Sequence, residues 1–316
     1  MRYVRLGRSG LKVSVVSLGS WLTLGNTVDQ AATDRLVAHA RELGVNLFDT
    51  ADVYARGDGE LALGKAIGSL RREHLVLASK CFFPMSDDVN DRGLSRKHVV
   101  ESLHASLRRL GTDYLDLYQC HRHDPDTPIE ETAAAMADLI RQGKILYWGV
   151  SQWPAWAIAA VVAWCRSHGL PAPISNQPVY NLFDRDIETE VMPVGAEHGV
   201  GQIVYSPLAQ GVLTGKYVDG VAPGADTRAG NAKANQFIAR YLTPERHAQV
   251  AGLRKLAIRT GRTCGQLALA FCLARKEVAS VIVGSTRLTQ LEENVAAADA
   301  SLAPDVLADL DRLFPV

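Results

Sequence analysis

Short apolar runs alternate with longer amphipathic stretches along almost the whole chain. Eight of the apolar runs, rich in β-branched and aliphatic residues, predict buried strands at residues 15–20, 46–50, 75–80, 115–121, 145–151, 173–178, 202–207 and 280–285. Helical periodicity lies between most of them, for example at residues 29–43, 95–110, 129–141, 154–168 and 288–300. Ser95 and Thr127 fit N-cap positions of two of these helices. Gly44, Gly111 and Gly143 fit C-terminal stops.

This alternation predicts the fold class. Strands that alternate with helices are parallel and joined by helical crossovers, and nearly continuous apolar strands are buried on both faces. Eight such units predict an α/β fold closed into a (β/α)8 TIM barrel. An open doubly wound sheet is the alternative, but after the first strand only Gly19 and Gly25 occur, so its fingerprint G-x-G-x-x-G is absent. Residues 3–6 and 11–15 flank a turn-forming cluster and predict an N-terminal β-hairpin cap.

Length and segment composition refine this picture. A chain of 316 residues fits one barrel with insertions, so residues 1–316 are expected to form a single domain. Residues 208–243 are too many, and too rich in Gly, Ala and Asn, for an ordinary connection. We expect a functional loop there. Residues 304–313 predict one last amphipathic helix.

Charge and cysteine usage exclude several classes of partner. The chain has 34 basic and 34 acidic residues without a long run of one sign, so neither nucleic acid nor a membrane surface is an expected partner. The five cysteines are scattered and lack C-x-x-C spacing, which argues against a disulfide framework and a zinc site and favours a reducing cytoplasm. No apolar stretch approaches the roughly 20 residues that span a bilayer. We therefore expect a cytoplasmic protein that binds no metal.

Four polar side chains stand at or just after the ends of successive predicted strands: Asp49, Tyr54, Lys80 and His121. Loops at the carboxyl ends of barrel strands carry active sites, so these side chains are expected to converge. Reduction of a carbonyl group needs a hydride on carbon and a proton on oxygen. Tyr54 can donate that proton, a nearby Lys80 would favour the phenolate, and Asp49 would hold Lys80 charged. A neutral His121 would donate a hydrogen bond to the substrate oxygen. Each residue alone also has an ordinary structural explanation.

The segments GVNLFDTADVY, LASK and LDLYQCHRHDP resemble signature segments of the aldo-keto reductase superfamily. The resemblance runs from LGRSGLKVSVVSLGSW to VGSTRLTQLEEN, and it aligns Asp49, Tyr54, Lys80 and His121 with that family's catalytic tetrad. GSW, YSPLAQGVLTGKY and GSTRLTQLEEN are most similar to the branch of potassium-channel β-subunits and their bacterial relatives, which include reductases of small aldehydes and triose phosphates. That branch often has Asn in place of His121, so His121 favours an active reductase.

The resemblance implies NADP(H) as cofactor, held by residues spread over the later strand ends. Ser151 and Gln177 match positions that hold the nicotinamide carboxamide, and Tyr205 matches the aromatic residue that stacks on the ring, with core packing as its alternative. The expected loop over the pyrophosphate comprises Ser206, Pro207, Leu208, Ala209, Gly211 and Lys216, joined by Arg228. The expected adenosine end comprises Gly284, Ser285, Thr286, Arg287, Gln290, Glu293 and Asn294. Further expected cofactor contacts are Ser20, Trp21, Asp49 and Gln152.

Arg287 bears on the choice between NADPH and NADH, and Gln152 differs from the residues common in the family. The Arg287 guanidinium offers a bidentate fork to the 2′-phosphate, which favours NADPH over NADH, although a solvated arginine at a helix start is the alternative. Gln152 departs from the family, whose members commonly have Asn, Ser or Arg after the serine. For the substrate pocket we expect the walls to be formed by Trp21, Tyr54, His121 and Trp153. Both tryptophans have core filling as their alternative.

The sequence therefore predicts an enzyme that reduces small aldehydes or ketones with NADPH. One alternative is an NADPH-binding regulatory or channel-associated subunit with weak reductase activity. A barrel hydrolase or lyase is another, but it lacks a metal-ligand cluster and leaves Lys80 and Tyr54 without a role. Relatives in the channel-subunit branch are often tetramers or larger, so the resemblance also implies a homo-oligomer.

Overall fold

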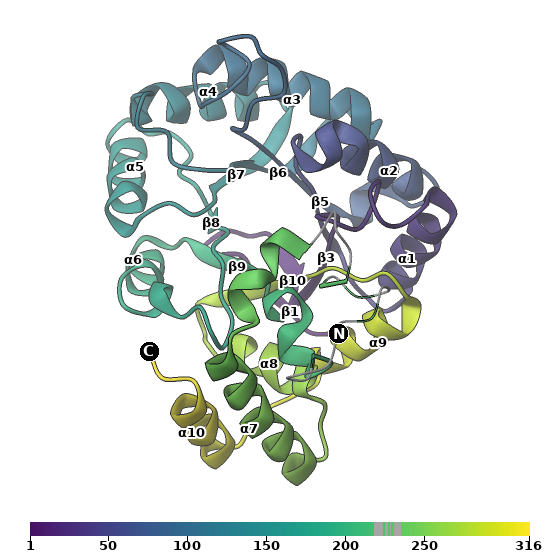
Figure 1. Cartoon of the computed structure of the whole chain (residues 1–316). Coiled ribbons are helices and arrows are strands. Elements are labelled where there is room, and N and C mark those ends of the chain that lie inside the picture. Colours follow the sequence, from purple (N-terminus) through teal and green to yellow (C-terminus); the bar gives the residue numbers. More distant parts are fainter. Residues whose placement is uncertain (218–223, 225–226, 228, 231–234) are drawn as a thin grey trace.

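The computed structural model describes residues 1–217, 224, 227, 229–230 and 235–316. In this part of the chain a closed parallel barrel forms in the order β10-β3-β4-β5-β6-β7-β8-β9. Its strands are β3 (Val16–Gly19), β4 (Leu47–Asp49), β5 (Val76–Cys81), β6 (Leu115–Cys120), β7 (Ile145–Val150), β8 (Ser175–Asn176), β9 (Gly201–Tyr205) and β10 (Val278–Val283). Helices surround the strands (Figure 1). The predicted TIM barrel is confirmed.

Helices alternate with the strands, as predicted, and the six predicted ranges correspond to the first, the third to fifth and the last two of the ten described helices. They are α1 (Gln30–Glu42), α2 (Asp58–Ile67), α3 (Arg96–Leu110), α4 (Ile129–Arg141), α5 (Ala155–Ser167), α6 (Val191–His198), α7 (Pro244–Thr260), α8 (Cys264–Leu273), α9 (Leu288–Ala296) and α10 (Pro304–Leu313). In α3 the Ser95 side chain accepts from the backbone of His98, and Gly111 with φ 65° ends the helix, as predicted. Thr127 is not a cap, because α4 begins after Pro128 and the Thr127 hydroxyl donates to Asp124 instead.

An antiparallel hairpin of β1 (Tyr3–Arg5) and β2 (Lys12–Ser14) closes the amino end of the barrel, as predicted. Leu6 and Val13 are fully buried against the inward side chains of the strands, including Leu47 and Leu117. The turn approaches the start of β9 so closely that a Cβ on Gly7 would lie 2.3 Å from the Gly199 carbonyl oxygen. Because the hairpin blocks this end, access to the barrel interior is left to the carboxyl ends of the strands.

Backbone strain gathers at that open end. Among the described residues, the non-glycine residues with positive φ are Leu22, Ala55, Arg56, Gln152, Ser206, Ala209 and Gln210. All of them lie in loops that follow β3, β4, β7 or β9. Left-handed backbone costs about 1–3 kcal/mol for such residues and persists where the surroundings impose it, commonly at functional sites. No helix among the described residues is long and apolar enough to cross a membrane.

Candidate active site

Lys80, Asp49 and Tyr54 form a hydrogen-bonded chain at the carboxyl ends of β4 and β5. The fully buried Lys80 Nζ donates to Asp49 Oδ1 at 2.6 Å, to the Thr50 carbonyl oxygen at 2.7 Å and to the Tyr54 hydroxyl at 3.3 Å. The other carboxylate oxygen, Asp49 Oδ2, accepts from Gln177 Nε2 at 2.9 Å. All donors of the ammonium group are thus engaged, and one of them fixes the position of the Tyr54 oxygen.

His121 joins this group from the end of β6. Its ring centroid lies 5.7 Å from that of Tyr54 with an interplanar angle of 77°, and 4.9 Å from that of Phe83. The backbone N–H of His121 donates to the Cys81 carbonyl oxygen, which extends the pairing of β5 and β6 by one residue. Nδ1 of His121 is buried and has no hydrogen-bond partner in the described chain. The four residues predicted to converge therefore do so.

Burial is the main cause of the pKa shifts of Tyr54, His121 and Lys80. Burial, and next the carboxylate of Asp49, raises the pKa of Tyr54 well above 10. This direction is opposite to the sequence-based expectation that Lys80 would favour the phenolate, because desolvation and the charge of Asp49 are the main causes of the shift. Burial, and next the charge of Lys80, lowers the pKa of His121 well below 6.5. A neutral phenol and a neutral imidazole result at pH 7, and each can donate a hydrogen bond. Burial also lowers the pKa of Lys80, and Asp49 opposes that shift.

A buried acidic pair lies behind the Tyr54 loop. Asp52 accepts from the Ser102 hydroxyl at 2.8 Å, and Glu60 accepts from the Ser79 hydroxyl at 2.5 Å and from Arg109 Nε at 2.6 Å. Both carboxyl groups are 0 % exposed. In the described part of the chain Arg109 pairs with Glu60, and no cation lies within ion-pair distance of Asp52.

The substitution Asp52→Asn is expected to flatten the pH dependence of stability between about pH 4 and pH 7. Burial, and next the charge of Glu60, raises the pKa of Asp52 from 3.8 to about 7. In this window the folded protein keeps a proton that the unfolded chain releases, so the stabilisation is complete below pH 4 and is lost as pH rises through 7. Urea unfolding across this range measures the slope. The exposed Asp87→Asn is the matched control, and an unchanged slope in Asp52→Asn would contradict the assignment.

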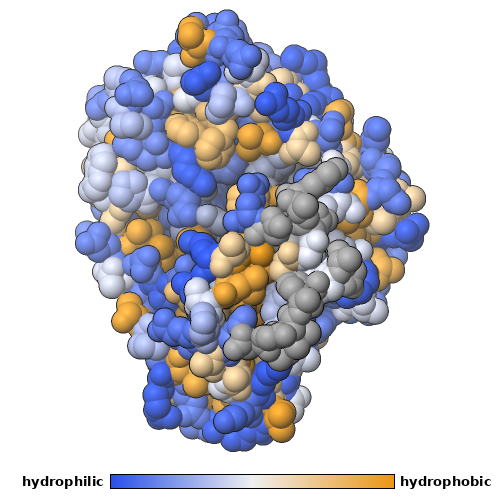
Figure 2. Space-filling view, in the orientation of Figure 1, coloured by the Kyte–Doolittle hydropathy of each residue, from blue (hydrophilic) through white to orange (hydrophobic). Residues whose placement is uncertain are grey.

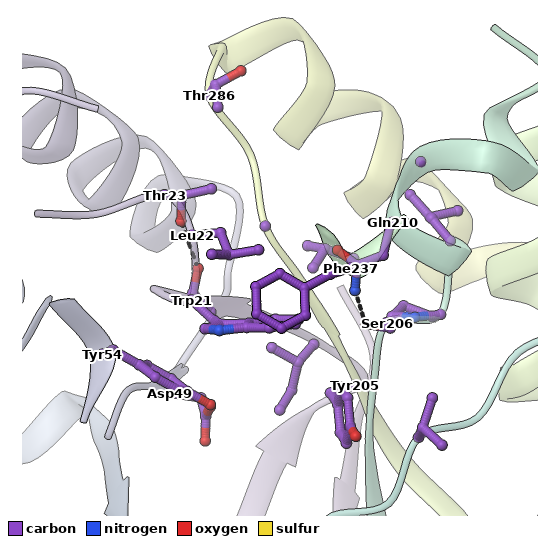
Figure 3. A pocket seen from close by; sticks show the side chains of 18 of the residues that line it. Trp21, Leu22, Thr23, Asp49, Tyr54, Tyr205, Ser206, Gln210, Phe237 and Thr286 are labelled. Carbon is purple, nitrogen blue, oxygen red and sulfur yellow. Dashed lines mark hydrogen bonds between the residues drawn. The ribbon is translucent and has the colours of Figure 1, made fainter. Parts of the chain in front are cut away.

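A cavity of about 1080 Å³ opens above these residues. It is hollowed into the face seen in Figure 2, with apolar side chains at its centre. In Figure 3, Phe237 lies over Trp21, with Asp49 and Tyr54 to one side and Tyr205 and Ser206 to the other. The ring centroids of Trp21 and Phe237 are 4.9 Å apart. This enclosure is large enough for an elongated ligand and is aromatic at the tetrad end.

Most of the residues predicted to hold the cofactor line this cavity. They are Trp21, Asp49, Ser151, Gln152, Gln177, Tyr205, Ser206, Pro207, Leu208, Gly211, Lys216, Gly284, Thr286, Arg287, Gln290, Glu293 and Asn294. Tyr205 is partly exposed rather than buried in the core, and its hydroxyl accepts from Gln152 Nε2 at 2.6 Å. Gln152, the departure from the family pattern, thus fixes the edge of the Tyr205 ring.

Several predicted residues do not reach the cavity. Trp153 is only 2 % exposed and packs against His123, so it is not a wall of the pocket. The Ser20 hydroxyl is turned inward and donates to Thr50 Oγ1 at 2.8 Å. Ala209 and Ser285 are buried off the cavity. Arg228 lies outside the described residues.

Other lining residues were missed. Phe83 and Arg122 lie within three residues of the strand-end residues Lys80 and His121, so the rule that gave the tetrad could have included them. Phe237, Arg240 and Tyr241 belong to the long segment predicted as a functional loop, but nothing in its sequence indicates which side chains turn inward. Leu22, Thr23, Asn26 and Thr27 line the cavity from the loop after β3.

The end of the cavity away from the tetrad fits a phosphate-bearing ligand. Lys216 and Arg287 line it, and neither forms an ion pair with a carboxylate in the described chain. A Cβ on Gly211, at φ 96°, would lie 3.2 Å from Lys216 Nζ, so glycine keeps room for the ammonium group. At the tetrad end, the Gln177 side-chain amide donates to the Asp49 carboxylate, and the Ser151 hydroxyl donates to the Gln177 carbonyl oxygen at 2.8 Å. Cations at one end and amide groups beside the tetrad match the two ends of a nicotinamide dinucleotide.

Comparison with known proteins agrees with this geometry. Residues 15–314 match the model of the Aldo/keto reductase family. The chain is 43 % identical over 319 residues to a "Probable voltage-gated potassium channel subunit beta" of Arabidopsis thaliana, covering 99 % of this chain and 97 % of the relative. It is 42 % identical over 318 residues to a protein of the same name from Oryza sativa subsp. japonica, with coverage of 99 % and 96 %. A "Putative voltage-gated potassium channel subunit beta" of Schizosaccharomyces pombe is 41 % identical over 319 residues, with coverage of 98 % and 92 %. The chain belongs to the aldo/keto reductase family, whose members bind NAD(P)H and act on small carbonyl compounds.

Proposed function

We propose that this protein reduces aldehydes or ketones to alcohols with NADPH, and that Tyr54 is the proton donor. The observation that carries the proposal is the Tyr54 hydroxyl, held 3.3 Å from Lys80 Nζ and beside the ring of His121 at one end of the cavity. When bound, NADPH supplies the hydride. The protein must then place the carbonyl oxygen between two donors and deliver one proton to it.

The proposed roles follow from the contacts. Tyr54 and neutral His121 donate hydrogen bonds to the carbonyl oxygen, and Tyr54 gives up its proton as negative charge develops there. The phenolate that remains accepts a hydrogen bond from Lys80 Nζ, which the carboxylate of Asp49 keeps in place. In the ground state burial raises the pKa of Tyr54, so the phenol keeps its proton until the substrate oxygen needs it. Trp21 and Phe237 exclude water from this step.

The direct test is steady-state oxidation of NADPH with a panel of carbonyl compounds such as methylglyoxal and 4-nitrobenzaldehyde. Many turnovers per active site support an enzyme. The second candidate is a regulatory subunit that holds NADPH and docks on a partner, which the names of the three relatives favour. Such a subunit is expected to oxidise bound NADPH about once and to retain the product. We favour the enzyme because His121 supplies the second donor at a position where that branch often has Asn.

Cofactor choice gives a separate prediction. Arg287→Ala is expected to weaken binding of NADPH roughly 10- to 100-fold and to leave NADH unchanged, because a charge-assisted hydrogen bond to the 2′-phosphate contributes about 1.5–3 kcal/mol. Quenching of tryptophan fluorescence measures both dissociation constants. Lys276→Ala, at the amino end of β10 and 89 % exposed, is the control. An unchanged ratio of the two constants in Arg287→Ala would mean that Arg287 is a solvated side chain outside the site.

We propose that residues 1–316 act as one barrel domain, in the cytoplasm, as a homo-oligomer such as a tetramer. The balanced charge, the scattered buried cysteines and the high identity to named channel subunits support these statements. Sedimentation equilibrium tests the assembly, and a monomer at micromolar concentration would contradict it.

A further inference from the structure

The segment that carries Tyr54 has a strained backbone that its surroundings must hold in place. Ala55 and Arg56 have φ of 50° and 53°, and Gly57 has φ 98°, so three successive residues lie in the left-handed region. Non-glycine residues keep such a backbone where neighbouring groups impose it. The first turn of α2 follows at once, and a Cβ on Gly59 would lie 3.2 Å from both Cβ and the carbonyl oxygen of Tyr54. The start of α2 therefore determines where the Tyr54 side chain begins.

Glu60, in the same turn of α2, connects this segment to the strand that carries Lys80. It is 0 % exposed, and its two carboxylate oxygens accept from Ser79 Oγ at 2.5 Å and from Arg109 Nε at 2.6 Å. Ser79 directly precedes Lys80 in β5, and successive side chains of a strand point to opposite faces. The Ser79 hydroxyl thus meets α2 behind the strand, while Lys80 reaches the Tyr54 hydroxyl in front of it.

Arg109 supports the segment from α3. Its side chain passes Gly57, where a Cβ would lie 2.8 Å from Arg109 Cδ and 3.1 Å from Nε, so the missing side chain of glycine leaves room for it. The Glu60 carboxylate holds the guanidinium group there by a charge-assisted hydrogen bond. One buried carboxylate therefore joins β5, α2 and α3 around the backbone that follows Tyr54.

We propose that Glu60 is a positioning residue for proton transfer, which fixes the Tyr54 hydroxyl within reach of Lys80 Nζ. This inference rests on the proposed carbonyl reduction. Glu60 touches neither substrate nor cofactor, because it is buried behind β5 and does not line the cavity. The distance between the Tyr54 hydroxyl and Lys80 Nζ is 3.3 Å, just beyond the usual range for a hydrogen bond, so a small shift of the segment breaks the contact. A displaced proton donor slows the chemical step and leaves binding of the cofactor unchanged.

The substitution Glu60→Gln tests this role, because it keeps the shape of the side chain and removes its charge. We expect the chemical step, measured by single-turnover oxidation of NADPH with 4-nitrobenzaldehyde, to slow roughly 10- to 100-fold. The dissociation constant for NADPH is expected to stay within about threefold. The solvent isotope effect on this step, from rates in H2O and D2O, is expected to rise because transfer of the proton then limits it.

Ser79→Ala is the second variant, since it leaves both buried charges in place and removes one hydrogen bond to Glu60. It is expected to slow the chemical step by a smaller factor of about threefold to tenfold. If Glu60→Gln is too unstable to assay, this variant decides the question, and a wild-type rate in it overturns the inference.

Asp116→Asn is the matched control for loss of a buried ion pair. Asp116 is 6 % exposed and pairs with Arg72 at 2.7 Å, but it stands at the amino end of β6, away from the cavity. Urea unfolding is expected to show lower stability in both Asp116→Asn and Glu60→Gln, whereas only Glu60→Gln slows the chemical step. Equal slowing in both variants would show a merely structural role and overturn the inference, as would an unchanged rate in Glu60→Gln. Absence of turnover in the wild type with every carbonyl compound of the panel would instead overturn the proposed function.

Discussion

Replacing Tyr54 by phenylalanine is expected to lower kcat for carbonyl reduction by roughly a hundredfold to ten-thousandfold, the usual contribution of a positioned proton donor. The ring and its contacts with Trp21 and His121 remain, so the shape of the cavity is preserved. Only the hydroxyl is lost, and among the described residues its one hydrogen bond is to Lys80 Nζ. The dissociation constant for NADPH is expected to stay within about threefold, because the phosphate-binding end is untouched. Pre-steady-state oxidation of NADPH measures the chemical step directly.

Tyr147→Phe provides the control for removing a phenolic hydroxyl, since Tyr147 packs at the opposite, hairpin-covered end of the barrel. It is expected to retain wild-type turnover. Undiminished turnover in Tyr54→Phe would show that the Tyr54 hydroxyl is not the proton donor. A fall in kcat accompanied by loss of NADPH binding would point to a damaged site rather than a missing proton.

Much of the fold is visible in the sequence because burial on both faces leaves a continuous apolar run. β5 and β6 are buried along their whole length and fall where their runs predict them. The strand predicted at residues 173–178 is reduced to β8, and its two residues, Ser175 and Asn176, are polar. The ends were less accurate. The predicted helix at residues 288–300 tightens into a 3-10 turn at Ala297–Asp299, which the apolar spacing alone does not signal.

In the site too, residues at strand ends could be placed from the sequence, whereas residues on loops could not. Asp49 and Lys80 stand at strand ends, where the barrel geometry fixes both position and direction, so their convergence could be predicted. Direction is not fixed in the loops: Trp21 faces the cavity while its neighbour Ser20 turns inward, and Trp153 is buried. The sequence also gives no measure of how deeply a side chain on a loop, such as Tyr54, is buried. The raised pKa of Tyr54 follows from desolvation, which appears only once the surrounding loops are in place.

Replacing Lys80 by methionine is expected to affect both stability and catalysis. Asp49 and Lys80 are 3 % and 0 % exposed, and their atoms are 2.6 Å apart, so the substitution leaves a buried carboxylate without its ammonium partner. Removing one partner of such a pair typically costs about 3–5 kcal/mol. Turnover is expected to fall at least roughly a hundredfold, since the phenolate of Tyr54 loses the donor that stabilises it. Urea unfolding and NADPH oxidation measure the two effects separately.

The double variant Asp49→Asn/Lys80→Met separates these two effects. Removing both charges relieves the unpaired carboxylate, so most of the lost free energy of unfolding is expected to return while turnover stays low. The exposed Lys65→Met in α2 is the control for the side-chain change itself and is expected to alter neither quantity appreciably. Recovery of turnover together with stability in the double variant would show that Lys80 acts only by neutralising Asp49. Low turnover in a stable double variant instead assigns Lys80 a direct contact with the developing phenolate, as its position 3.3 Å from the Tyr54 hydroxyl requires.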